Sequence, residues 1–155
     1  FHQNLIFEGV WRIVKEFPKL NFFISTKWKH RSGGTFGQLY QDLINSGISN
    51  VHEHVDPIYD LIPKCKYIFS ESSTLLAEAV FFNRIPLCYD PDPSFKFLYY
   101  RELLTDFITD TPEKLIGLIH KTLDHPVVFE KEKFNKLIHK EREHPWTIIK
   151  RDIKI

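Results

Sequence analysis

The sequence predicts an α/β domain in which a mostly parallel sheet of about five to six strands lies between two layers of helices. Short apolar segments of strand length alternate along the chain with amphipathic segments of helical period. Parallel neighbours need helical crossovers, and these place helices on both faces of the sheet. The 155 residues, 43% of them hydrophobic, suffice for one core. We therefore expect one three-layer αβα domain over residues 1–155.

The first half of the chain supplies three of the expected helices. Apolar residues recur every three or four positions before Pro18, which ends the first helix. Thr35 is placed to cap the second helix, and Gly47 to end it. Asp56 and Pro57 are expected to start the third helix, where Asp56 accepts hydrogen bonds from free backbone amides and Pro57 supplies the first helical φ angle. The expected helices span residues 5–17, 36–44, 58–62, 75–82 and 112–123, and the strands 20–25, 51–55, 67–69, 85–89 and 107–108.

The second half of the chain also contains residues that are typical of helix ends and turns. Asn83 is expected to end its helix in the left-handed conformation, and residues 90–93 (Asp-Pro-Asp-Pro) form a rigid loop. Thr111 and Pro112 provide a cap and a first-turn proline. Residues 131–155 carry eight basic and four acidic side chains, which predicts a helical, basic tail.

Composition excludes several classes of function. The formal net charge is +1, from 21 basic and 20 acidic residues, so no global field would attract nucleic acid. The two cysteines, Cys65 and Cys88, lie in apolar contexts and predict inert thiols in a reducing compartment. No apolar run approaches about 18 residues. We expect a cytoplasmic location, with peripheral association at the inner membrane face as an alternative. Since the chain begins at Phe1, we expect a fragment of a longer protein.

The turn after the third expected strand concentrates hydroxyl groups at the start of a helix. Ser70, Ser72, Ser73 and Thr74 surround free backbone amides there, which is a favourable arrangement for a phosphate. Glu78 lies one helical turn further, about 6 Å along the same face. A diphosphate over the helix start would place its ribose near that carboxylate. The alternative is that the serines only cap a helix and Glu78 is solvated.

The string from Tyr67 to Asp90, YIFSESSTLLAEAVFFNRIPLCYD, resembles the donor-binding segment of GT-B fold glycosyltransferases. It is similar in particular to teichoic acid glycerophosphotransferases and to capsule and sialic acid transferases with a paired-serine motif, and more distantly to UDP-sugar 2-epimerases. The resemblance implies that this chain is the Rossmann-like carboxyl-terminal half of such an enzyme. It also implies a cell-surface polysaccharide or teichoic acid-like polymer as the product.

The resemblance assigns roles residue by residue. It implies that Ser72, Ser73 and Thr74 bind the donor phosphates and that Glu78 binds the ribose. Relatives often carry Lys-x-His-Pro after the first strand, and this chain has Lys29 and His30 there without the proline, so these are the candidate phosphate-binding cations. The donor would be a nucleotide-sugar or a CDP-polyol, and no metal or other cofactor is implied. The acceptor site and the general base would belong to the amino-terminal half, so the fragment alone is expected to be inactive.

Three further residues are candidates for base or sugar contacts, namely Ser70, His54 and Asp90, because each lies near the carboxyl end of an expected strand. His52 and His54 share a strand face, but no third metal ligand is evident nearby, so we expect no metal site. Two other functions stay open. One is a 2-epimerase, and the other is a non-catalytic, flavodoxin-like interaction module whose basic tail binds a partner.

Overall fold

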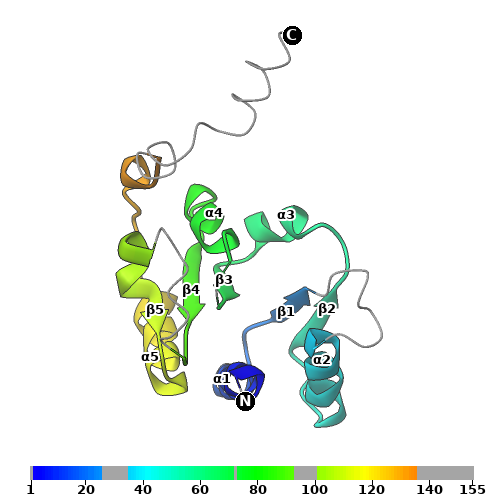
Figure 1. Cartoon of the computed structure of the whole chain (residues 1–155). Helices are drawn as coiled ribbons and strands as arrows, with labels where there is room; N and C mark the ends of the chain where they lie inside the picture. Colours follow the sequence, from blue (N-terminus) through cyan, green and yellow to red (C-terminus); the bar gives the residue numbers. More distant parts are fainter. Residues whose placement is uncertain (1, 26–34, 72, 93–100, 136–155) are drawn as a thin grey trace.

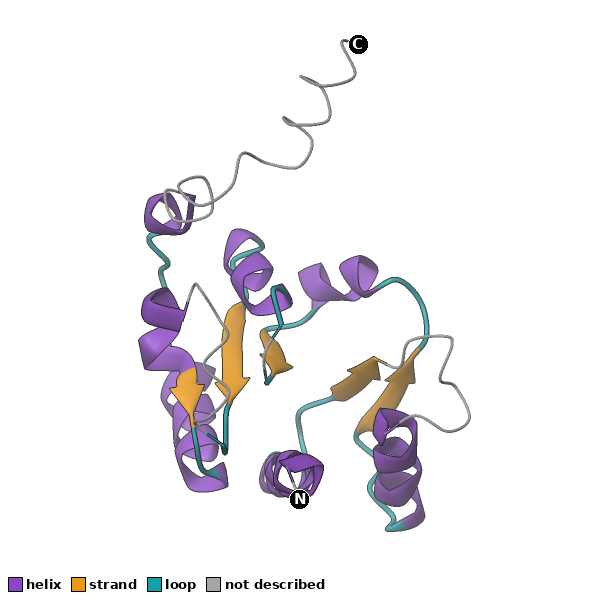
Figure 2. Cartoon of the chain, viewed as in Figure 1, coloured by secondary structure: helices purple, strands orange, loops and turns teal. Residues whose placement is uncertain are grey.

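The computed structural model describes residues 2–25, 35–71, 73–92 and 101–135, and helices and strands alternate along it (Figures 1 and 2). Residues 131–135 are helical, and the rest of the expected basic tail lies outside the described residues. In chain order the elements are α1 (His2–Glu16), β1 (Phe22–Ser25), α2 (Thr35–Asn45), β2 (Val51–His54), α3 (Ile58–Leu61), the 3-10 helix η2 (Ile62–Lys64), β3 (Tyr67–Ser70), α4 (Leu75–Phe81), β4 (Ile85–Tyr89), the 3-10 helix η3 (Arg101–Phe107), β5 (Ile108–Thr109) and α5 (Pro112–Leu123).

All the strand pairs are parallel, as expected, but the strands form two sheets. β1 pairs with β2, and β3, β4 and β5 form the second sheet in that order. The prediction of one sheet with five to six strands is therefore wrong for the described residues. A cavity separates β1 from β3, the two strands that would have to pair to join the sheets. Apolar periodicity identifies the buried face of a strand, but it does not say which edges meet.

The helices lie in two layers, with α1, α2 and α5 on one side of the strands and α3 and α4 on the other (Figure 1). The largest core cluster joins the first layer to both sheets. It contains Ile13 of α1, Leu43 of α2, Val51 of β2, Leu87 of β4 and Leu115 of α5. A second face of the three-stranded sheet is covered by α4. A single core thus spans the break between the sheets.

Helix α1 contacts β4 and α5, and the segment after it is held by the side chain of Asn50. Gly9 allows the helix to approach β4 closely, because a Cβ at this position would lie 2.4 Å from Cε1 of Tyr89. Arg12 forms an ion pair with Glu113 of α5. The side-chain amide of Asn50 donates to the carbonyls of Phe17 (3.1 Å) and Leu20 (3.0 Å). These bonds supply donors to backbone carbonyl groups just beyond the end of α1.

Strand β4 contains a proline although it is the middle strand of its sheet. The amide of Ile85 donates to the carbonyl of Lys66 on the β3 side, so the nitrogen of Pro86 faces the opposite side. β5 begins to pair with β4 only at Cys88. The missing amide hydrogen of Pro86 therefore costs the sheet no hydrogen bond between strands.

Most of the helix boundaries follow the sequence signals. Asn83 has φ 55° and Gly47 has φ 83°, as expected for left-handed helix ends. The hydroxyl of Thr111 accepts from the amide of Lys114 at 3.3 Å. The expected cap of α3 is wrong, because Pro57 (φ −54°, ψ 131°) lies before the helix and no side chain caps it, although the helix begins at Ile58 as expected. The helix η3 was not expected from the sequence.

Candidate functional site

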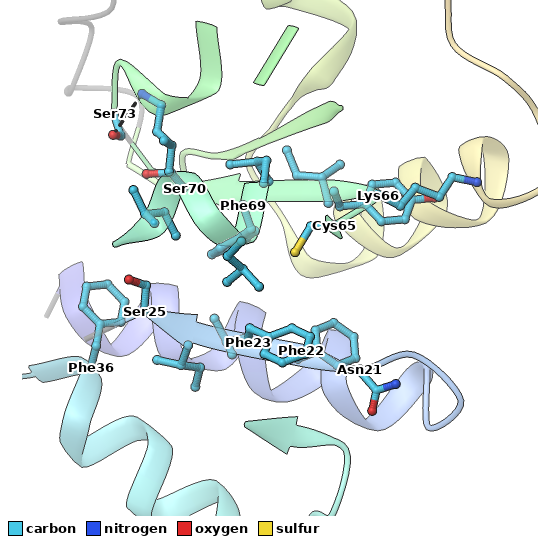
Figure 3. A pocket seen from close by; sticks show the side chains of 18 of the residues that line it. Asn21, Phe22, Phe23, Ser25, Phe36, Cys65, Lys66, Phe69, Ser70 and Ser73 are labelled. Atoms are coloured by element: carbon cyan, nitrogen blue, oxygen red, sulfur yellow. Dashed lines mark hydrogen bonds between the residues drawn. The ribbon is translucent and has the colours of Figure 1, made fainter. Parts of the chain in front are cut away.

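The cavity between β1 and β3 has a volume of about 1280 Å³ and runs along both strands. Its floor is apolar and is formed by α1, with Ile6, Val10 and Ile13 among the lining residues. Ser25 and Ser70 lie at one end of the facing strands, and Asn21 and Lys66 lie at the other (Figure 3). Both strands therefore present their carboxyl ends to the same part of the cavity.

Polar side chains gather at this carboxyl-terminal end. Ser70 ends β3, Ser73 and Thr74 precede α4, and Glu78 follows one turn into the helix, and all four line the cavity. The structure thus brings together these four of the sequence-predicted site residues. Ser72, Lys29 and His30, the other expected phosphate-binding residues, lie outside the described residues.

The start of α4 differs from the expected cradle of free amides. The hydroxyl oxygen of Ser73 accepts from the amide of Leu75 at 3.2 Å (Figure 3). The amides of Leu76 and Ala77 donate to the carbonyls of Ser73 and Thr74, each at 3.0 Å. The helix has seven residues, so its dipole is short. An anion at this turn would consequently depend on side-chain hydroxyls and cations more than on the amides of residues 75–77.

Glu78 has a neighbour that the sequence did not single out. Tyr59 of α3 also lines the cavity, near Glu78. Hydrogen bonding to the Glu78 carboxylate, followed by the charge of that group, raises the pKa of Tyr59, because both favour the neutral phenol. Tyr59 was missed because a single tyrosine in a four-residue helix carries no pattern, and only the packing of α3 against α4 brings it near Glu78.

The two remaining candidates lie apart from the cavity lining among the described residues. One ring nitrogen of His54, Nε2, lies 3.4 Å from the carbonyl oxygen of Pro57. Asp90 is 3% exposed at the end of β4, and one of its oxygens accepts from Arg101 at 2.6 Å. Its other oxygen, Oδ1, has no hydrogen-bond partner among the described residues. Asp90 thus forms a partly buried ion pair with Arg101, which joins η3 to the end of β4.

The described residues contain no group of three or more side chains arranged to hold a metal ion. Within the same residues, no helix combines the length and the apolar character needed to cross a bilayer. Comparisons with known proteins found no matching family model, and neither a curated protein nor a solved structure is significantly similar to the chain.

Proposed function

We propose that this chain is the nucleotide-donor-binding half of a GT-B glycosyltransferase that builds a cell-surface polysaccharide or a teichoic acid-like polymer. The observation that carries the proposal is the position of the cavity. From β1 the chain continues outward to β2, and from β3 it continues in the other direction to β4 and β5 (Figure 1). In parallel α/β folds, ligands bind at the carboxyl ends of the strands where the strand order reverses in this way.

The chemistry of the cavity supports a phosphorylated nucleoside as the ligand. The hydroxyls of Ser70, Ser73 and Thr74 would hold the phosphates, and Glu78 would accept from the ribose hydroxyls. The apolar floor offers space for uncharged parts of the donor. In the proposal, Ser72, Lys29 and His30 complete the phosphate site, since charged donors are needed to balance a leaving diphosphate.

The proposed mechanism is electrostatic. Negative charge develops on the leaving phosphate when the bond to the sugar or polyol breaks, and hydroxyl and cationic donors already in place stabilise it. Loss of one such donor typically costs about 3 kcal/mol in the transition state. The acceptor and the general base would come from an amino-terminal half. The chain on its own should therefore bind the donor without turning it over.

The test is a titration of isotopically labelled protein with CDP-glycerol, a CMP-sugar and a UDP-sugar. Binding should shift the amide resonances of residues 72–77. The start of α5, residues 111–115, is the matched control, because it also has a hydroxyl cap and lies outside the cavity lining. Unchanged resonances at residues 72–77 with all three donors would contradict the proposal.

A second candidate is a non-catalytic α/β interaction module, and the bond between Ser73 and the amide of Leu75 favours it. In such a module Ser73→Ala lowers the free energy of unfolding by about 1 kcal/mol, and Glu78→Ala has little effect. In a donor site, both substitutions weaken nucleotide affinity, and Glu78→Ala leaves the melting temperature nearly unchanged. Glu78→Ala therefore separates the two functions.

A further inference from the structure

The edge of β1 that faces the cavity carries backbone groups that β2 does not use. The amide of Phe22 donates to the carbonyl of Asn50 at 2.8 Å, so the backbone groups of Phe22 face β2. Successive residues of a strand point their backbone groups to opposite sides, and those of Phe23 and Ser25 therefore face the cavity. Among the described residues, no backbone hydrogen bond joins this edge to β3.

The facing edge of β3 has the same property. The carbonyl of Lys66 accepts from the amide of Ile85 at 2.9 Å, so the backbone groups of Lys66 face β4. By the same alternation, those of Tyr67 and Phe69 face the cavity. A strand edge with unpaired amides and carbonyls is a template for pairing with a further strand. Here two such edges lie on opposite sides of one cavity.

The two edges match in direction, register and face. Residues 21–25 and 66–70 run in the same direction and cover the same length of the cavity, which sets Phe23 opposite Ile68 (Figure 3). On both strands, the neighbours of this pair pack against the main core, namely Phe22, Ile24, Tyr67 and Phe69. The strands could therefore approach each other without turning any side chain to the other face of the sheet.

We propose that β1 and β3 pair with each other in a closed form of the protein, so that the cavity opens and shuts as the two strands part and join. In the closed form, the amide of Phe23 donates to the carbonyl of Tyr67, and the amide of Phe69 donates to the carbonyl of Phe23. The amide of Ser25 then reaches the carbonyl of Phe69. The resulting sheet has the order β2-β1-β3-β4-β5, and every pair in it is parallel.

Two short links connect the parts that would move. Residues 17–21 join α1 to β1, residues 55–57 join β2 to α3, and both links lie outside helices and strands, where hinges are usually found. Helix α1 stays with the three-stranded sheet through the ion pair of Arg12 with Glu113. Closure would shut the apolar part of the cavity and leave its polar end accessible, because that end lies at the carboxyl ends of the strands.

The first measurement is NMR detection of scalar couplings through hydrogen bonds in the unsubstituted 155-residue chain. The closed form should give a coupling from the amide nitrogen of Phe23 to the carbonyl carbon of Tyr67, and one from Phe69 to Phe23. The coupling from Phe22 to Asn50 is the internal control, because the structure contains that hydrogen bond. Detection of the control coupling without those between β1 and β3 would overturn the proposal.

The second measurement weakens the closed form at one amide. Phe23→Pro removes the donor that the closed form needs, and among the described residues this amide donates no hydrogen bond in the open form. Phe23→Ala removes the same ring, which is 46% exposed, and keeps the amide, so it is the matched control. Loss of one hydrogen bond should shift the equilibrium about 5-fold toward the open form. Phe23→Pro should therefore bind more anilinonaphthalene sulfonate, a dye that fluoresces in apolar cavities, than Phe23→Ala.

The outcomes decide for or against the closing motion. Couplings between β1 and β3, together with greater dye binding by Phe23→Pro, support it. If the two variants bind the dye equally, or not at all, the parting of β1 from β3 is overturned. If Phe23→Pro does not fold, the couplings in the unsubstituted chain decide. Neither measurement uses a nucleotide, so the proposed donor function and the closing motion can each fail without the other.

Discussion

The two sheets of this molecule differ in how helices and core side chains cover their faces. Every residue of β4 is buried, since α4 packs on one face of the three-stranded sheet and the main core on the other. In β1, half-buried and exposed residues alternate, and Phe23 is 46% exposed against the ring of His52. The three-stranded half resembles the interior of a parallel α/β domain. The two-stranded half has one covered face.

The difference shows where each half obtains its stability. A two-stranded sheet is marginal by itself in water. Here β1 and β2 share a core with α1 and α2, and that same core contains Leu87 of β4 and Leu115 of α5. The two-stranded half is therefore expected to fold with the three-stranded half, even though no strand pairing between described residues links them.

The strongest test of this coupling removes a core side chain from the two-stranded half. Leu43 of α2 is 0% exposed, and Leu43→Ala should lower the free energy of unfolding by about 3 kcal/mol, through lost burial and an unfilled cavity. Ile44→Ala, the next residue of α2 and 38% exposed, should cost much less. Hydrogen exchange should accelerate in β4 as well as in β1 and β2. Acceleration confined to α2, β1 and β2 would show that the halves are independent.

A smaller effect is expected where α1 crosses to the three-stranded half. Gly9→Ala places a Cβ against the ring of Tyr89 and should lower the free energy of unfolding by about 2 kcal/mol, since ring and helix must move apart. Gly117→Ala in α5 is the matched control, because the added Cβ would meet no described residue outside its own helix backbone within 4 Å. It should stabilise by up to about 1 kcal/mol through helix propensity. Equal denaturation midpoints for the two variants would contradict the close contact of α1 with β4.

The smallest effect concerns the two thiols, of which one lies at the cavity and the other within the buried strand β4. Cys65 lines the cavity, and Cys88 lies within β4. Burial, followed by the charge of Asp90, raises the pKa of Cys88 to about 11, so little reactive thiolate is present at pH 8. Iodoacetamide at that pH should modify Cys65 first, as mass spectrometry of peptides would show. Equal modification rates for the two thiols in the native protein would mean that Cys88 is not protected by burial in β4.

The raised pKa of Cys88 also sets the sign of a pH dependence. The unfolded thiol ionises near its ordinary value of 9.0, whereas the native thiol stays neutral to about 11. The stability from this group is complete below pH 9 and is lost as the pH rises toward 11. Cys88→Ala should therefore show a shallower loss of stability over this interval than the unsubstituted protein.

Local signals in the sequence determined the elements and several of their boundaries. The periodicity before Pro18 predicted α1, and the prediction for β4 matches the observed strand, residues 85–89. Asn83 and Thr111 act where their chemistry predicted. These features follow from the sequence because a helix end or a cap depends on a few adjacent residues. The serine turn and Glu78 could be proposed as one site for the same reason, since one helical turn separates them.

The tertiary structure decided what depends on partners distant in the chain. It divided the strands of the expected single sheet into two sheets with a cavity between β1 and β3, and it satisfied amides of α4 that were expected to be free. It also placed Tyr59 and Glu78 at the same cavity and paired Asp90 with Arg101. Edge pairing and side-chain pairing across elements depend on how whole faces pack, and the period of a single segment carries no information about its distant neighbour.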